Sequence, residues 1–149
     1  LGIGTQFNDY EEAEMAKPGW NDIKIEGSFK ESIKRELEEG GSQVLDLQVY
    51  EGDGEIEAYA FAAIRERDGE VCCVTCLLKH MHHHEDTETL YLKEFHDIEG
   101  PYAAFAPVRI LRLLSPTSDP EALAWRAQCR AFWRTPGSRR QFNPVPMKR

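Results

Sequence analysis

The stretch EIEAYAFAAIRERDGEVCCVTCLLKH, residues 55–80, decides the fold. Its first half has aliphatic side chains at positions 56, 58, 60, 62 and 64 and aromatic ones at 59 and 61, which is the two-residue period of a β-strand. Asp68-Gly69 is typical of a tight turn between antiparallel strands. The β-branched and apolar residues that follow predict a second strand from 70 to about 80. The stretch therefore predicts a long β-hairpin.

Shorter strands are predicted on both sides of this hairpin. Residues 44–50 alternate, with Leu45, Leu47 and Val49 expected to point inward, and turn residues at 51–54 connect them to the hairpin. A polar stretch at 81–88 precedes a fourth short strand around residues 89–95. Because consecutive strands joined by short connections pair as neighbours, the sequence predicts an antiparallel meander of about four strands.

Three helices are predicted outside the sheet. Ser28 begins a capping box, and the helix that follows is expected to end at Gly40-Gly41. Beyond residue 100 the apolar period changes, and a short helix is predicted between Pro107 and Pro116. Residues 118–121 cap a last helix. The predicted fold class is α+β, with one N-terminal and two C-terminal helices packed on one face of the sheet.

The composition indicates a single folded domain. Of the 149 residues, 41% are hydrophobic and 30% are charged, which is the balance of a globular protein with one core. Within the net charge of −8, residues 1–70 carry 18 acids against 7 bases, whereas the end of the chain is basic. We predict a loosely ordered acidic leader at 1–14, a single α+β domain at 15–135 and a basic C-terminal tail at 136–149.

The sequence disfavours a membrane setting. No apolar run is long enough for a membrane-spanning helix. The acidic N-terminal residues do not resemble a signal peptide. The sequence therefore predicts a cytoplasmic protein that has no membrane partner.

Three of the four cysteines lie on the second strand of the hairpin. Because side chains alternate along a strand, Cys72 and Cys76 are expected on one face and Cys73 on the other. The spacing Cys73-x-x-Cys76 would then hold its two sulfurs apart, whereas zinc and redox sites need them together. We interpret the cysteines as small, buried hydrophobic residues.

Four of the five histidines lie between residues 80 and 84. If the strand continues through this segment, His80, His82 and His84 project from one face. Two of them plus a third ligand, such as His96 or Asp97, could hold zinc or another divalent metal. A metal-binding or metal-dependent hydrolytic domain is therefore the first alternative function. The other interpretation is a solvated hairpin tip with no cofactor.

A row of arginines marks the last predicted helix. Arg126, Arg130 and Arg134 recur every four residues, and Arg139 and Arg140 extend the row. Such a row could follow the phosphates of a nucleic acid, and nucleic-acid binding is the second alternative function. The row could equally be solvated or pair with the acidic half of its own chain.

Several segments carry a family resemblance. They are Gly19-Trp20, the charged segment that contains Tyr91, Lys93, Glu94, Asp97, Glu99, Gly100 and Pro101, the segment Leu-Leu-Ser-Pro-Thr at 113–117, and Trp-Arg-x-x-Cys-Arg beginning at Trp125. In these segments the chain resembles a family of small uncharacterised proteins, a domain of unknown function, encoded on bacterial phages, plasmids and integrative elements. The resemblance covers roughly residues 20–133. It implies a setting among the accessory genes of mobile elements and implies no activity.

Sequence motifs of common enzymes are missing. The chain has no Gly-rich phosphate loop, no G-x-S-x-G elbow and no H-E-x-x-H helix. The carboxylates of the charged segment suit an acid–base pair, but they equally suit the end of a strand and the orientation of the Gly100-Pro101 turn. An enzyme is therefore less favoured than a binding protein.

The leading hypothesis is a non-catalytic accessory protein that binds a macromolecular partner from the host or a competing element, with counter-defence as its role. The oligomeric state is not predicted.

Overall fold

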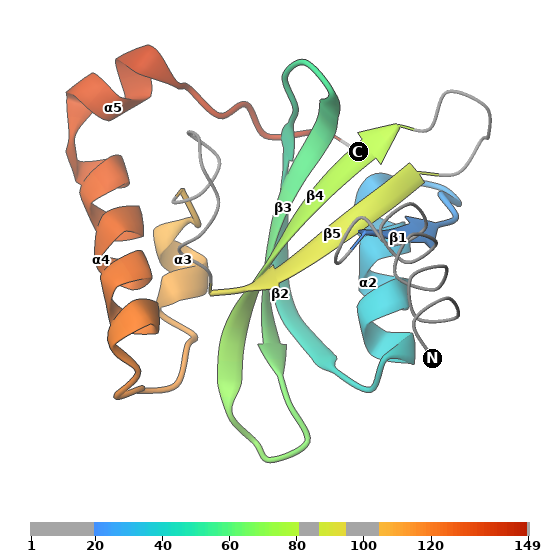
Figure 1. Cartoon of the computed structure of the whole chain (residues 1–149), viewed down its shortest axis with the longest axis horizontal. Helices are drawn as coiled ribbons and strands as arrows, with labels where there is room; N and C mark the ends of the chain where they lie inside the picture. Colours follow the sequence, from blue (N-terminus) through green and yellow to red (C-terminus); the bar gives the residue numbers. More distant parts are fainter. Residues whose placement is uncertain (1–19, 81–86, 95–104, 149) are drawn as a thin grey trace, which may run out of the picture.

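A computed structural model of the chain describes residues 20–80, 87–94 and 105–148. Its sheet and helices form three layers, with the sheet between α2 on one side and α3, α4 and α5 on the other (Figure 1). In chain order the described elements are β1 (Trp20–Ile23), α2 (Phe29–Glu39), β2 (Gln43–Glu51), β3 (Ile56–Arg65), β4 (Val71–His80), β5 (Thr87–Lys93), α3 (Val108–Leu111), α4 (Pro120–Arg134) and α5 (Pro136–Gln141). The α+β class with an antiparallel sheet is confirmed.

The predicted hairpin forms the middle of the sheet. β3 and β4 pair from Ile56↔Lys79 to Arg65↔Val71, and the turn between them has Gly69 at a φ of 90°. A positive φ carries little steric cost for glycine, which explains the Asp68-Gly69 signal. The strand order β1-β5-β4-β3-β2 contains the predicted meander of β2 to β5.

The structure corrects the expected number of strands. β1 is a fifth strand that pairs with β5 through Trp20↔Leu90 and Ile23↔Thr87. Its four residues include Asn21 and Asp22, which have low strand propensity. β1 forms a strand because it pairs with β5, and so the sequence of residues 20–23 alone does not predict a strand there.

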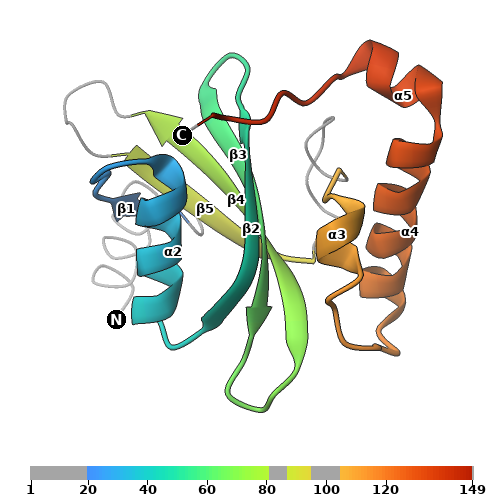
Figure 2. The same ribbon diagram turned by 180° about the vertical axis from the view of Figure 1, so that it is seen from behind.

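The expected placement of every helix on one face of the sheet is wrong. α2 covers one face, and α3, α4 and α5 cover the opposite face (Figures 1 and 2). The physical reason lies in β3, where Ala58, Ala60 and Ala62 pack on the α2 side while Tyr59 and Phe61 pack on the α4 side. A strand that is apolar on both sides needs cover on both faces.

The expected inward orientation of Leu45 together with Leu47 and Val49 is wrong, because β2 contains a β-bulge. Leu47 and Val49 pack in the core on the α2 side as expected, but Leu45 packs on the α4 side. The pairing register shifts between Val44 and Asp46, which adds one residue to β2 and reverses the alternation.

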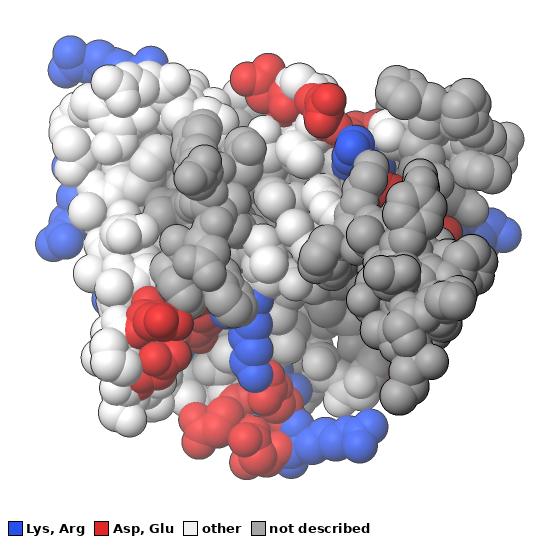
Figure 3. Space-filling model, in the orientation of Figure 1, with Lys and Arg blue, Asp and Glu red and all other residues white. Residues whose placement is uncertain are grey.

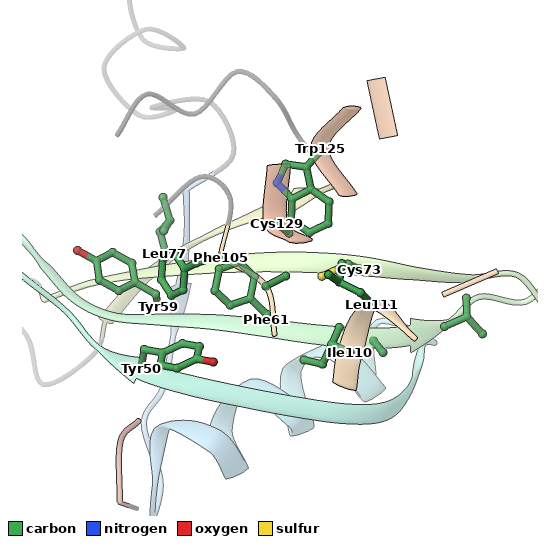
Figure 4. Close-up of a cluster of buried hydrophobic side chains, with 13 residues drawn as sticks. Tyr50, Tyr59, Phe61, Cys73, Leu77, Phe105, Ile110, Leu111, Trp125 and Cys129 are labelled. Atoms are coloured by element: carbon green, nitrogen blue, oxygen red, sulfur yellow. The ribbon is translucent and has the colours of Figure 1, made fainter. Parts of the chain in front are cut away.

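The core on the α4 side is aromatic. The rings of Tyr50, Tyr59, Phe61 and Phe105 lie together over the sheet, and Trp125 of α4 lies nearby (Figure 4). Phe105 is fully buried, with its ring centroid 4.7 Å from that of Phe61 and 5.2 Å from that of Tyr50. Edge-to-face contacts at these distances add to the energy of apolar burial.

The expected alternation of the cysteines is confirmed, and Cys73, Cys76 and Cys129 are buried as expected, whereas Cys72 is only half-buried. Cys73 is buried on the α4 side, together with Cys129, whereas Cys72 and Cys76 pack on the α2 side. Burial raises the pKa of the Cys129 thiol to about 12. That of Cys76 is also raised by burial. These thiols therefore stay protonated near neutral pH.

The segment expected as a basic tail is docked on the domain. Residues 136–141 form α5, and Tyr50 of β2 forms a β-bridge with Pro146.

Among the described residues, no helix combines the length and apolar character that crossing a membrane requires.

The Gly52→Ala variant is expected to lose about 1–3 kcal/mol of unfolding free energy. A Cβ atom at position 52 would lie 2.0 Å from the carbonyl oxygen of Ile56, so the β2–β3 turn would have to open. Urea unfolding measures the loss. Gly137→Ala in α5 is the control, because its Cβ meets nothing within 4 Å. Equal destabilisation of the two variants would show that the close approach at Gly52 is unimportant.

Candidate functional site

A cleft of about 380 Å³ opens at one end of the sheet. It lies between the β3–β4 hairpin, the end of β5 and the connection from α3 to α4. Acidic side chains gather on both sides of this region, at the start of α4 and around the hairpin, with basic side chains between them (Figure 3). The residues that line it are Glu66, Asp68, Glu70, Val71, Cys72, Lys93, Glu94, Ser115, Pro116, Thr117, Asp119, Glu121, Ala122 and Arg126.

The unequal lengths of β4 and β5 create this cleft. Lys93, the last residue of β5, pairs with Val74, so the first residues of β4 extend beyond their partner strand. At Val71, where β5 no longer pairs with β4, Ser115 of the α3–α4 connection forms the hydrogen bonds that a neighbouring strand would form. The Ser115 N–H donates to the Val71 carbonyl oxygen at 2.9 Å, and the Val71 N–H donates to Ser115 Oγ at 2.9 Å. These two bonds hold the α3–α4 connection against the sheet.

A buried ion pair forms the floor of the cleft. Arg126 of α4 binds Glu94 through two parallel bonds, from Nε to Oε2 at 2.9 Å and from Nη2 to Oε1 at 2.8 Å. Its Nη1 donates to the Ser115 carbonyl oxygen at 2.7 Å. The two side chains are only 8% and 6% exposed. Such a two-point pairing fixes both side chains, because the guanidinium is planar and rigid.

Glu94 also continues the pairing of β4. Its N–H donates to the Cys73 carbonyl oxygen at 3.0 Å, and its Oε1 accepts from the Cys73 N–H at 3.1 Å. The backbone of Glu94 is left-handed, with a φ of 41°. Few residues other than glycine adopt this conformation, which is found where surrounding contacts enforce it.

A second ion pair lies at the rim. The Lys93 ammonium contacts Glu66 Oε1, and Cys72 Sγ donates to the same oxygen at 3.3 Å. The hydrogen bond from Lys93 lowers the pKa of Glu66, and the same bond raises the pKa of Lys93. Burial raises the pKa of Cys72 to about 12, so this thiol is a donor and not a nucleophile near neutral pH.

The charges of the cleft do not balance. Six carboxylates and two basic side chains line it. Both basic side chains are paired with carboxylates of the cleft itself. Within residues 20–80, 87–94 and 105–148, no lysine or arginine forms an ion pair with Asp68, Glu70 or Asp119. A concave surface with excess negative charge concentrates cations and positively charged groups.

Three segments singled out in the sequence meet at this cleft. They contribute Lys93 with Glu94, the residues 115–117, and Arg126. Trp125 is buried in the core beneath α4, and Tyr91 packs on the α2 side, away from the cleft. Four further residues of the charged segment, Asp97, Glu99, Gly100 and Pro101, lie outside the described residues.

The alternative metal site of the sequence involves four histidines, of which the structure describes one. His82, His84 and His96 lie outside the described residues. His80 ends β4, with its Nδ1 3.6 Å from Glu57 Oε2. Over the part of the chain that the structure describes, no three His, Cys, Asp or Glu side chains are grouped to share a metal ion.

The row of arginines on α4 is divided between the interior and the surface. Arg126 points inward to Glu94 and is not available to a nucleic acid. Arg130, Arg134 and Arg140 are exposed, and Arg134 Nε donates to the Arg130 carbonyl oxygen at 3.3 Å. The side chain of Arg139 is outside the described part.

Sequence reasoning missed the acidic walls of the cleft. In the sequence, Asp68 belongs to the predicted turn and Asp119 to the predicted cap of the last helix, whereas Glu66 and Glu70 carry no functional prediction. Asp119 does cap α4, since its Oδ1 accepts from the Glu121 N–H at 3.2 Å. The sequence does show a high density of carboxylates around the hairpin turn, which could have indicated one acidic wall. It does not show that the start of α4 lies next to this turn and forms the opposite wall.

Comparison with family models, curated proteins and solved structures gives no match to this chain.

Proposed function

We propose that the protein is a non-catalytic binding protein whose acidic cleft receives a basic side chain of a macromolecular partner. The observation that supports this is the charge of the cleft. Both of its own basic groups are already paired, and Asp68, Glu70 and Asp119 on two opposite walls form no ion pair with a lysine or arginine among the described residues. A lysine or arginine of the partner would complete the charge balance there.

The walls of the cleft are held in place before a ligand arrives. The hairpin wall follows directly from β3 and β4, and the opposite wall is fixed to β4 through Ser115 and to β5 through the pair of Arg126 with Glu94. Binding to a preformed site avoids the entropic cost of ordering its walls. The ion pair in the floor also offsets the charge of Arg126, so that Arg126 repels an incoming cation less.

The family resemblance supports a biological setting for this activity. We place the protein among cytoplasmic accessory proteins of mobile elements, with counter-defence as its role. A basic partner is consistent with such a role, because proteins that act on nucleic acids carry lysine and arginine at their binding surfaces. The acidic half of the chain would favour the encounter with such a protein through long-range attraction.

Removal of two carboxylates from the cleft is expected to weaken binding of a basic peptide about tenfold, which is about 1.4 kcal/mol. The probe is a fluorescent peptide of alternating arginine and glycine, titrated at 0.15 M salt as a test condition at about physiological ionic strength. The variant carries Glu70→Gln and Asp119→Asn, one change in each wall. Asparagine caps a helix as well as aspartate does, so α4 keeps its start.

The matched control removes the same charge elsewhere. Glu38→Gln with Glu39→Gln changes two exposed carboxylates at the end of α2. We expect this variant to bind the peptide within twofold of the unmodified chain. Equal weakening by both variants would mean that the peptide follows net charge and not the cleft. No binding by the unmodified chain would contradict the proposed function outright.

A further inference from the structure

The chain's own C-terminal segment occupies the outer edge of the sheet. β2 is the last strand in the sheet order, and its end pairs with residues 145–147. The Glu51 N–H donates to the Val145 carbonyl oxygen at 2.8 Å, and the Met147 N–H donates to the Val49 carbonyl oxygen at 2.9 Å. From α5 the segment crosses the end of the sheet to the side of α2 (Figures 1 and 2).

The side chain of Met147 anchors this segment. It packs against the core on the α2 side, whereas the side chain of Val145 is 46% exposed. Beside Met147 lies a cavity of about 360 Å³. Its apolar lining comes from Ile25 and Phe29, and Gly27, Ser28, Glu51 and Lys148 complete it. Met147 therefore leaves room next to the strand for a larger apolar side chain.

The edge of β2 is closed to another strand at Leu47. The Leu47 N–H donates to the Asp46 carboxylate Oδ1 at 2.8 Å, so the side chain of Asp46 replaces a neighbouring strand there. Arg109 holds Asp46 in place, with Nε 3.0 Å from Oδ2. Blocking an edge with a charged side chain is a known protection against unwanted pairing. At Val49–Glu51 no charged side chain blocks the edge among the described residues. Residues 145–147 cover it there, and Gln48 Nε2 also donates to the Val49 carbonyl oxygen at 3.5 Å.

We propose that the edge at Val49–Glu51 and the cavity beside it form a binding site for an extended segment of a partner protein. The segment adds as an antiparallel strand to β2 and places one bulky apolar side chain in the cavity. Residues 145–147 act as an internal competitor that occupies the site until the partner displaces it. This mode of recognition uses backbone bonds for affinity and one side-chain pocket for specificity. It involves none of the residues of the acidic cleft.

The first step of the test releases the segment in the full-length chain. Met147→Asp places a carboxylate against an apolar core, and we expect hydrogen exchange at the Glu51 amide to become at least tenfold faster. Val145→Asp is the matched control, since it introduces the same charge at an exposed position of the same segment. In that variant Glu51 should keep its slow exchange. Unchanged exchange at Phe61 in β3 shows that the domain stays folded.

The second step adds a probe for the vacated edge. It is a synthetic peptide with the sequence of residues 143–148 that carries Met147→Trp. We expect it to bind the Met147→Asp chain at least tenfold more tightly than the unmodified chain or the Val145→Asp chain, with NMR shift changes at Val49 and Glu51. Slow exchange at Glu51 in the Met147→Asp chain would refute the anchoring role. Fast exchange without peptide binding would refute the strand-addition site.

Discussion

Replacement of Arg126 by methionine is expected to lower the free energy of unfolding by about 3–5 kcal/mol. Methionine can fill much of the same space, but it leaves the carboxylate of Glu94 buried without its cation. It also removes the bond from Nη1 to the Ser115 carbonyl oxygen. A buried charge without a partner is far more costly than the pair was favourable. Equilibrium unfolding in urea measures the loss.

Two comparisons separate this effect from a general loss of charge. The double variant with Arg126→Met and Glu94→Gln should regain part of the stability, because glutamine keeps an oxygen acceptor for the Cys73 N–H and carries no charge. Arg35→Met breaks an exposed pair with Glu26, in which the side chains are 36% and 56% exposed. That change should lower stability by less than about 1 kcal/mol. Equal losses for Arg35→Met and Arg126→Met would contradict the structural role of the buried pair.

The Phe105→Ala variant is expected to be destabilised by about 3–5 kcal/mol. The ring of Phe105 is fully buried between the sheet and the C-terminal helices, and it contacts the rings of Tyr50, Phe61 and Phe142. Its removal leaves a cavity that a packed sheet cannot close. Thermal unfolding followed by near-ultraviolet circular dichroism reports both the stability and the aromatic environment.

Phe142→Ala is the matched control for the aromatic core. This ring also contacts Phe105, at a centroid distance of 5.0 Å, but it is only partly buried. Its truncation should therefore cost clearly less than that of Phe105, because solvent already reaches part of the site. If Phe142→Ala lowers the stability more than Phe105→Ala does, Phe105 is not the central residue of the aromatic core.

The central part of the fold was predictable because its signals are local. The alternation in β3, the Asp68-Gly69 turn and the run of β4 define a hairpin whose observed strands begin and end within one or two residues of the prediction. The capping residue Ser28 likewise begins α2, and its hydroxyl accepts from the Glu31 N–H at 3.1 Å. Each of these features depends on residues that are close together in the sequence.

The errors arose where distant residues decide the structure. The aromatic side chains of β3 indicate that its second face is apolar, and this signal favours helices on both faces of the sheet rather than on one. The bulge that turns Leu45 away depends on pairing with β3, and β1 depends on pairing with β5. Neither feature has a signature in its own segment.

The candidate site was predictable only in part for the same reason. Motifs single out Lys93, Glu94 and Arg126. The sequence leaves open whether the arginine row binds phosphates, is solvated or pairs with residues 1–70, and it does not indicate Glu94 as the partner of Arg126. Residues 94 and 126 are far apart in the sequence, and only the packing of α4 against the end of β5 brings them together. The carboxylates of the hairpin and of the α4 cap meet across the cleft through the same packing.

The most direct test of the proposed function is an NMR map of the bound peptide. Amide shifts of isotopically labelled protein are recorded while the peptide of alternating arginine and glycine is added. The proposed function predicts that the largest shift changes cluster at 66–72, 93–94 and 115–121, the segments that line the cleft. Changes that cluster instead on the carboxylates of α2, or that spread evenly over the acidic surface, would contradict the claim that the cleft receives the basic side chain.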